Sequence, residues 1–161
     1  MNQANAVGWA LAAGLVMVAT ERALPGSVLP RVRGWFGRVV AINLFQVGIA
    51  IISGLTWNRW LQGRSLLVVA HWPDGLAVGA TYFVTTFIFY WWHRIRHESA
   101  FWWRVAHQIH HSASRLEVLT SFYKHPVEIA INSVLCAAIC YPLMGCSAAQ
   151  GGLYTLVLAV A

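Results

Sequence analysis

The sequence predicts an all-α integral membrane protein, a bundle of about four spanning helices that carries a cytosolic, histidine-rich helical cap. Three observations predict this class. Of the 161 residues, 58% are hydrophobic and only 10% are charged, whereas soluble proteins carry about 25% charged residues. Four long stretches contain no Asp, Glu, Lys or Arg. Five of the seven histidines lie in one short segment that directly follows the third of these stretches.

The first three charge-free stretches have the length of single membrane spans. They are Met1–Thr20, Val39–Trp57 and Gly75–Trp92. A helix needs roughly 20 apolar residues to cross a hydrocarbon core of roughly 30 Å, so we expect spans at about 4–20, 39–57 and 75–92. Because Met1–Val7 has no basic residue, the first stretch lacks the basic region of a cleavable signal peptide and is expected to be retained.

The fourth charge-free stretch, Ile129–Ala161, is too long for one straight span. Its 33 residues would reach about 50 Å as a helix. We therefore expect a helical hairpin over 127–161. The candidate helix breakers are Pro142, Gly145 and the pair Gly151–Gly152.

The basic residues predict the orientation in the membrane. Four Lys and Arg residues lie in 21–38, two in 58–74 and five in 93–124. This alternation follows the positive-inside rule and predicts that the first and third of these segments are cytoplasmic. The net charge of +6 is explained by this topology, so no nucleic-acid partner is expected.

Without a repeat or a linker, residues 1–161 are expected to form a single domain. Cys136, Cys140 and Cys146 all lie in the fourth apolar stretch and are expected to pack as small hydrophobic side chains.

The histidine spacing predicts a metal site. His93 and His97 are four residues apart, so on a helix continuing from the third span they project from one face. The spacings of His107, His110 and His111 bring these three onto one helical turn. Imidazole suits iron, zinc and copper, so the histidines alone do not select the metal. His71 stands apart from these five histidines, beside Trp72, and is expected to be structural.

A further marker follows the histidine segment. In His125-Pro126-Val127-Glu128, proline suits the first turn of a helix and the acidic residue favours the positive end of the helix dipole. A helix returning into the membrane therefore explains Pro126 and Glu128. It leaves His125 unexplained.

Together these motifs resemble the membrane fatty acid hydroxylase and sterol desaturase superfamily. The matching features are Tyr90-Trp91 before His93-x-x-x-His97, then His107-x-x-His110-His111-Ser112, then Thr120-Ser121-Phe122 leading into His125-Pro126-Val127-Glu128. The resemblance covers about 81–128. It implies a four-helix membrane base and a cytosolic cap in which histidines hold two non-haem iron ions. By this resemblance the metal ligands are His93, His97, His107, His110 and His111, with His125 as a ligand or a partner of one.

The sequence departs from the family pattern in two places. Thr86 stands where the family often has an acidic residue, which would change a hydrogen bond to a ligand. The family's last histidine cluster, which follows the second hairpin, is not in these 161 residues. Five or six histidines are few for two metal ions, and the apolar segment Gly152–Ala161 ends without a polar flank. We therefore expect the reading frame to continue and to supply another cluster.

The resemblance implies an O2-dependent oxidoreductase that hydroxylates or desaturates a C–H bond of a fatty acyl or sterol-like lipid. No dinucleotide fingerprint or haem-attachment motif is present in the sequence. A separate electron donor is therefore expected, a cytochrome, a ferredoxin or a reductase. If this donor is acidic, the docking candidates are Arg94, Arg96, Arg104 and Arg115.

Three alternatives remain open from the sequence. The chain could be a catalytically incomplete membrane protein that keeps a metal site for structure or partner binding. It could be a b-haem electron carrier, although haem needs two facing histidines rather than five at one membrane edge. A zinc membrane protease is disfavoured, because Arg94 stands where that mechanism needs a glutamate base.

Overall fold

The computed structural model describes residues 3–26 and 28–160, and within these ranges every regular element is helical. The long helices are α1 (Gln3–Ala23), α2 (Trp35–Leu55), α4 (Asp74–Glu98), α7 (Pro126–Ala138) and α8 (Ala148–Val160). The short ones are α3 (Trp57–Trp60), η1 (Val69–His71), α5 (Ala100–Trp102), η2 (Trp103–His107), α6 (Gln108–His111), η3 (Val118–Phe122) and η4 (Ile139–Leu143). The all-helical prediction is therefore confirmed for the described chain.

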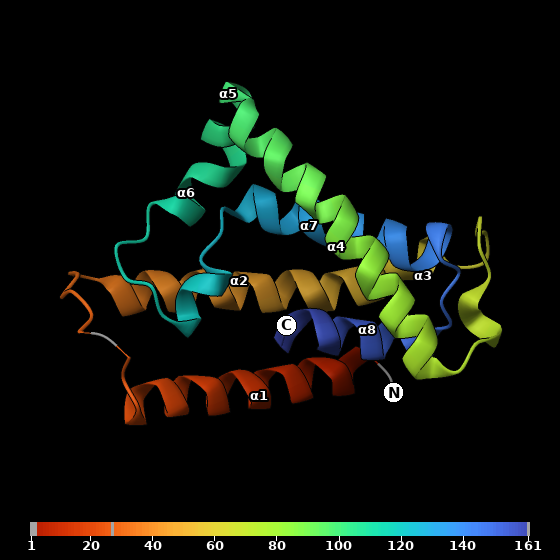
Figure 1. Cartoon of the computed structure of the whole chain (residues 1–161), viewed down its shortest axis with the longest axis horizontal. Coiled ribbons are helices and arrows are strands. Elements are labelled where there is room, and N and C mark those ends of the chain that lie inside the picture. The colour runs from red at the N-terminus through yellow and green to blue at the C-terminus, as the bar shows by residue number, and fades with distance from the viewer. Residues whose placement is uncertain (1–2, 27, 161) are drawn as a thin grey trace.

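The long helices form two groups. Helix α8 packs against α1 and α4, while α2 packs against α7 (Figure 1). The inclined helix α4 runs away from the other long helices, and α5, η2 and α6 lead the chain back towards the start of α7 (Figure 1). The histidines of 93–111 lie on α4, η2 and α6. The buried apolar core lies where α4, α7, η4 and α8 meet, and includes Ala77, Ile139 and Tyr154.

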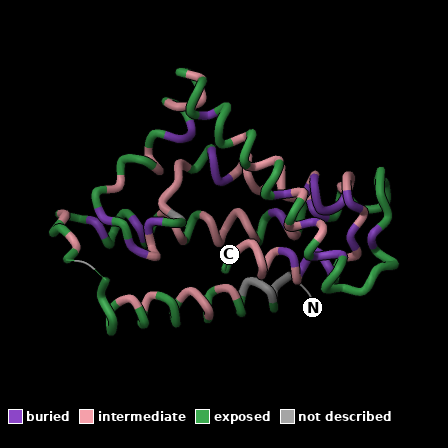
Figure 2. Tube along the Cα trace, in the orientation of Figure 1, coloured by how far each residue is buried: buried purple, intermediate pink, exposed green. Residues whose placement is uncertain are grey.

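Two segments are long and apolar enough to cross a membrane, Trp35–Trp60 and Pro126–Leu143. The first buries few of its residues, and Leu44 and Leu55 are 67% and 60% exposed (Figure 2). An apolar helix in the core of a soluble protein would bury such side chains. The exposure therefore favours contact with lipid. That α1 and α4 also cross the membrane stays a prediction.

Polar contacts place the loop after α1 at the same end of the molecule as residues 93–124, which we call the histidine-bearing segment. Arg22 Nη2 donates to Glu117 Oε2 at 2.7 Å, and Arg115 Nη1 donates to the carbonyl of Pro30 at 2.8 Å. Trp35, the first residue of α2, donates its indole N–H to Glu117. This agrees with the prediction that 21–38 and 93–124 share one side of the membrane.

The opposite end is closed by the segment before η1. The backbone amides of Leu66 and Leu67 donate to the carbonyls of Pro142 and Leu143 at 2.8 and 2.9 Å. Gly145 adopts a φ of 68°, and a Cβ there would lie 2.2 Å from the Leu67 carbonyl oxygen. The left-handed conformation and the close approach both require glycine.

The fourth apolar stretch turns back as expected, but one predicted breaker is wrong. The chain turns between η4 and α8, around Gly145, and Pro142 lies in the irregular η4 just before the turn. Gly151 and Gly152 lie inside α8. A Cβ on Gly151 would lie 2.3 Å from the hydroxyl oxygen of Tyr141. Gly151 therefore does not end α8; its missing side chain leaves room for Tyr141 to pack against the helix.

The cysteines behave as the sequence predicts. Cys140 and Cys146 are 1% and 7% exposed and belong to the buried core. The three cysteines of the described chain are free thiols, and Cys136 is half-buried on α7. Packing is therefore confirmed as the role of Cys140 and Cys146.

Cysteine labelling tests the orientation. In a variant whose native cysteines are replaced, single cysteines at Gly34 and Ser114 are expected to react only with reagent on the cytoplasmic side, and one at Gly63 only with reagent on the other side. The reason is the four-two-five distribution of basic residues. Labelling of position 114 from outside intact cells would show that the orientation is inverted.

Replacing Glu117 by alanine tests the junction between the histidine-bearing segment and the first two helices. Glu117 is 6% exposed and accepts hydrogen bonds from Arg22, Trp35 and Arg115. Hydrogen bonding from Arg115 lowers the pKa of this carboxyl. Its loss would leave buried donors unpaired, at a cost of about 3 kcal/mol. We expect faster tryptic cleavage after Arg115. Replacement of exposed Glu98 should leave the cleavage rate unchanged, and equal rates in both variants would contradict this role of Glu117.

Candidate metal centre

Helix α4 delivers the first two histidines. It continues past the predicted span to Glu98, so His93 and His97 lie one turn apart on the same face. Their Nε2 atoms are 3.0 Å apart. The helix ends at Ser99, whose hydroxyl accepts from the Trp102 amide at 3.4 Å and starts the next turn. The predicted helical pairing of His93 and His97 is confirmed.

The next two histidines come from η2 and α6. Segment η2 is a π-helical turn, a widened turn that is common at functional sites. The Nε2 atom of His107 lies 3.3 Å from Nε2 of His97 and 3.0 Å from Nε2 of His111. His107 therefore joins the α4 pair to His111.

These four side chains form what we call the histidine cluster: His93, His97, His107 and His111. Their ligand atoms all lie within 4.8 Å of one another. His107 is fully buried, whereas the other three are exposed. Four imidazoles that converge at such distances could bind one metal ion between them. The indole of Trp103 stacks on His111 with ring centroids 5.5 Å apart and forms one wall.

A buried carboxylate sets the tautomer of His107. The Nδ1 atom of His107 lies 3.3 Å from Oε2 of Glu128, and Arg96 pairs with the other oxygen of the same carboxylate. Both Arg96 and Glu128 are buried, at 3% and 1% exposure. Because a carboxylate accepts, Nδ1 of His107 carries the proton and Nε2 has a free lone pair. This is the arrangement by which proteins orient a histidine towards a metal.

The contact between Arg96 and His93 acts in the opposite sense. Nη2 of Arg96 lies 3.4 Å from Nδ1 of His93. A guanidinium can only donate, so this long contact favours a proton on Nε2 of His93. Metal binding through Nε2 of His93 therefore requires the hydrogen bond between Arg96 and His93 to break. The ion pair with Glu128 still holds the Arg96 guanidinium in place.

The surroundings of three members of the cluster, His93, His107 and His111, favour the neutral imidazole. Burial lowers the pKa of His107 to about 3, with the Arg96 charge adding to the effect. Burial also lowers the pKa of His93 and of His111. Only a neutral imidazole offers a lone pair to a metal. His93, His107 and His111 therefore offer lone pairs to a metal at neutral pH.

Two predicted ligands lie outside the cluster. His110 turns away, and its Nδ1 lies 3.3 Å from the carbonyl oxygen of Tyr123. A carbonyl accepts, so Nδ1 is protonated and Nε2 is free to bind a metal. His125 caps α7, and its Nδ1 accepts from the Val127 amide at 3.1 Å. Ligation by His110 and His125 stays a prediction. His71 is exposed in η1, far along the chain from the cluster.

Sequence reasoning assigned Glu128 only to the helix dipole and did not place it at the site. The structure shows it in contact with His107 and Arg96. The available signal was its place in the motif His125-Pro126-Val127-Glu128, but no spacing rule connects it to a histidine 21 positions earlier. Thr86, in contrast, is exposed and bonds to the carbonyl of Phe83 at 2.8 Å.

The arginines near the cluster divide into two kinds. Arg96 and Arg115 are buried and pair with Glu128 and Glu117. They are unavailable to an electron donor, which corrects that part of the sequence prediction. Arg104 and Arg94 are exposed, although Arg94 also pairs with Glu98 at 2.7 Å.

Comparison with known proteins finds relatives that are named as aldehyde decarbonylases. Very-long-chain aldehyde decarbonylase GL1-8 of Oryza sativa subsp. indica is 36% identical over 96 residues, which cover 56% of this chain and 35% of that protein. GL1-11 of the same subspecies is 40% identical over 72 residues, covering 44% of this chain and 27% of that protein. The chain thus spans about a third or less of the length of these relatives. No significant match was found among solved structures.

The sequence pattern that defines the fatty acid hydroxylase family matches residues 78–161, just over half of the chain. This range contains most of α4, the complete histidine cluster and the carboxylate of Glu128. The cluster thus lies in the part of the chain that carries the family pattern, and the chain belongs to the fatty acid hydroxylase family.

Proposed function

We propose that this chain provides the histidine-rich part of a non-haem di-iron, O2-dependent enzyme that oxidises a C–H bond of a lipid. The observation that carries the proposal is the histidine cluster, in which four imidazoles converge at the end of a long helix and one of them is oriented by a buried carboxylate. Membership of the fatty acid hydroxylase family supports a lipid substrate. The two relatives named as aldehyde decarbonylases support one with a long chain.

The cluster fits iron chemically, because imidazole nitrogens are common iron ligands. His93, His97, His107 and His111 would hold one ion. His110 presents a free Nε2 beside the cluster, with its ring centroid 5.6 Å from that of His107, and would contribute to the second ion together with His125. When bound, the iron pair would supply the reductive activation of O2.

The chain's own residues would orient the ligands and limit the access of water. Glu128 holds His107 in the tautomer that frees Nε2, and Arg96 neutralises the carboxylate in a buried position. Trp103 covers the His111 side of the cluster. The apolar segments that contain α2 and α7 are long enough to cross a membrane, and they would let a hydrophobic substrate approach from the bilayer.

We propose that a separate protein supplies the electrons. The exposed Arg94 and Arg104 lie on the segments that carry the cluster and would attract an acidic cytochrome, ferredoxin or reductase. The electron donor would then approach the cluster from the aqueous side. The lipid would approach from the other side.

The test is product analysis with the whole gene. Membranes that carry the gene and a supplied reductase are incubated with and without O2, and their lipids are compared by mass spectrometry. An O2-dependent hydroxylated or desaturated lipid, with two irons per chain by metal analysis, is the expected result. Bound metal without a product would favour a metal-binding protein with no catalysis, and an intense Soret band would favour a haem carrier.

A further inference from the structure

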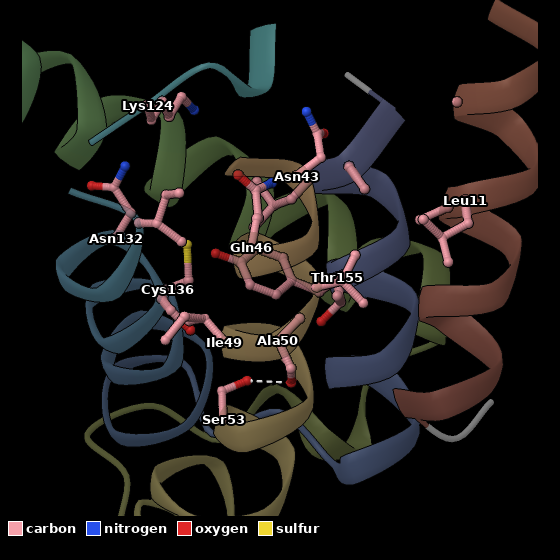
Figure 3. Close-up of a pocket in the computed structure, with 18 of the residues that line it drawn as sticks. Leu11, Asn43, Gln46, Ile49, Ala50, Ser53, Lys124, Asn132, Cys136 and Thr155 are labelled. Carbon is pink, nitrogen blue, oxygen red and sulfur yellow. Dashed lines mark hydrogen bonds between the residues drawn. The ribbon is translucent and has the colours of Figure 1, made fainter. Parts of the chain in front are cut away.

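A cavity separates the two groups of long helices. It has a volume of about 500 Å³ and lies between α1 and α8 on one side and α2 and α7 on the other (Figure 3). This volume is within the roughly 300–1,000 Å³ of ligand pockets. Its lining contains no member of the histidine cluster. The cavity is therefore a separate site.

The cavity is long and largely apolar. Along α7 and η4 its lining runs from Ile129 to Tyr141, which is about 18 Å of helix at roughly 1.5 Å per residue. Leu15, Val18 and Leu158 are among the apolar side chains on the opposite wall. An elongated apolar space that runs parallel to membrane helices suits a hydrocarbon chain.

One end of the cavity carries a positive charge. Lys124 lines the cavity at the end nearest the histidine-bearing segment (Figure 3). It follows Tyr123, whose carbonyl contacts His110. Its ammonium group is half-buried and makes no hydrogen bond or ion pair with any residue in 3–26 or 28–160. The nearby carboxylate of Glu128 is already occupied by Arg96 and His107. A partly buried charge without a partner is costly, so this end lacks an anion.

Polar groups line the apolar wall below this charge. The side chain of Gln46 faces the cavity and makes no hydrogen bond within the described chain, and Asn132 uses its oxygen to accept from Trp92 Nε1 at 3.0 Å (Figure 3). The amide nitrogen of Asn132 is left to donate. Hydrogen-bond donors near one cation suit the oxygens of a lipid head group.

We propose that this cavity binds a single-chain lipid with an anionic head, with the head paired to Lys124 and the hydrocarbon chain lying between α1 and α8 on one side and α2 and α7 on the other. The carbons next to the head then lie closest to the histidine-bearing segment, and the methyl end lies farthest from it. This deepens the proposed function by naming a substrate class and its orientation, and it rests on that function only for the link to oxidation.

Equilibrium binding to the whole chain in lipid nanodiscs tests the charge pairing. The probes are palmitate and hexadecanol, which share a chain length and differ in head charge, at pH 8 and with empty nanodiscs as background. Palmitate is expected to bind about tenfold more tightly than hexadecanol, as for one charge-assisted hydrogen bond. Lys124→Gln should abolish this preference, whereas Lys124→Arg and Arg38→Gln, which changes an exposed cation on the same side, should retain it. Equal binding of both probes to the wild type would overturn the proposal.

A second variant tests the location. A Cβ on Gly14, which lines the cavity, would meet nothing within 4 Å, and the same is true of Gly8 on the same helix, which does not line it. Gly14→Leu should fill space in the cavity and weaken binding of both probes at least roughly tenfold. Gly8→Leu should bind as the wild type. Unchanged binding in Gly14→Leu would show that the lipid lies elsewhere.

Photo-crosslinking tests the orientation. Palmitate with a diazirine near its methyl end should label peptides that contain Tyr141 or Gly151, at the far end of the cavity. Labelling near Lys124 instead would show that the chain lies the other way round. All three measurements use protein without metal or electron donor. If they fail, the product test of the proposed function is unaffected. If the product test fails, these binding measurements can still be interpreted.

Discussion

Replacing His107 by alanine is expected to abolish activity and to remove the metal ion held by the histidine cluster. His107 is the one fully buried member of the histidine cluster, and its Nε2 contacts those of His97 and His111. Even the loss of a residue that only orients a ligand costs about 10–100-fold in metal affinity, so loss of this ligand should exceed that. Metal analysis of purified protein and product formation in membranes are the two measurements. The same result is expected for alanine at His93, His97 or His111.

Two controls show whether the effect belongs to the cluster. His71→Ala, in exposed η1, should leave metal content, membrane insertion and activity nearly unchanged. His110→Ala should abolish activity but lower bound iron from two ions to one, because its Nε2 would serve the second ion. Stoichiometric zinc with no dependence of activity on iron would rule out the oxidase mechanism.

Replacing Glu128 by alanine is expected to weaken metal binding and to destabilise the fold. Glu128 is 1% exposed and pairs with both Arg96 and His107. Removing one partner of a buried ion pair costs about 3–5 kcal/mol, because the other charge is left uncompensated. Loss of the carboxylate also frees His107 to adopt the wrong tautomer, which should lower metal affinity about 10–100-fold. Thermal unfolding and cobalt(II) titration measure the two effects.

A conservative variant separates orientation from folding. Glu128→Gln keeps an oxygen that accepts from Nδ1 of His107, so it should recover much of the cobalt affinity while remaining less stable than the wild type. Glu98→Ala removes an exposed pair with Arg94 and should cost at most about 1 kcal/mol. If Glu128→Ala bound cobalt as tightly as the wild type, the carboxylate would not be orienting His107.

The helices were largely predictable because hydropathy is a local property. The charge-free stretches predict the positions of α1, α2 and α4, and the histidine spacing of four residues predicts that α4 continues beyond its apolar part. Gly151 and Gly152 mislead, because glycine inside a helix is tolerated where a neighbour needs the space. Here the neighbour is Tyr141, which only the packing of η4 against α8 brings close.

The roles within His125-Pro126-Val127-Glu128 could not be assigned from spacing. The sequence accounts for Glu128 as a helix-dipole residue and leaves His125 without a local role. In the structure His125 caps the helix, and Glu128 reaches the cluster. His125 is the N-cap of α7, and Glu128 lies in its first turn. Which of these two side chains contacts His107 depends on how this end of α7 is oriented relative to α4 and η2.

The sequence alone determines the helical class, the apolar segments and the set of imidazoles, because composition and periodicity act over one or two turns of chain. Tertiary structure alone decides that four of these imidazoles share one cluster, that Glu128 and Arg96 lie behind it, and that Lys124 ends an apolar cavity. These contacts join residues far apart in the chain. Their geometry depends on how α4, η2 and α7 pack, which no local pattern encodes.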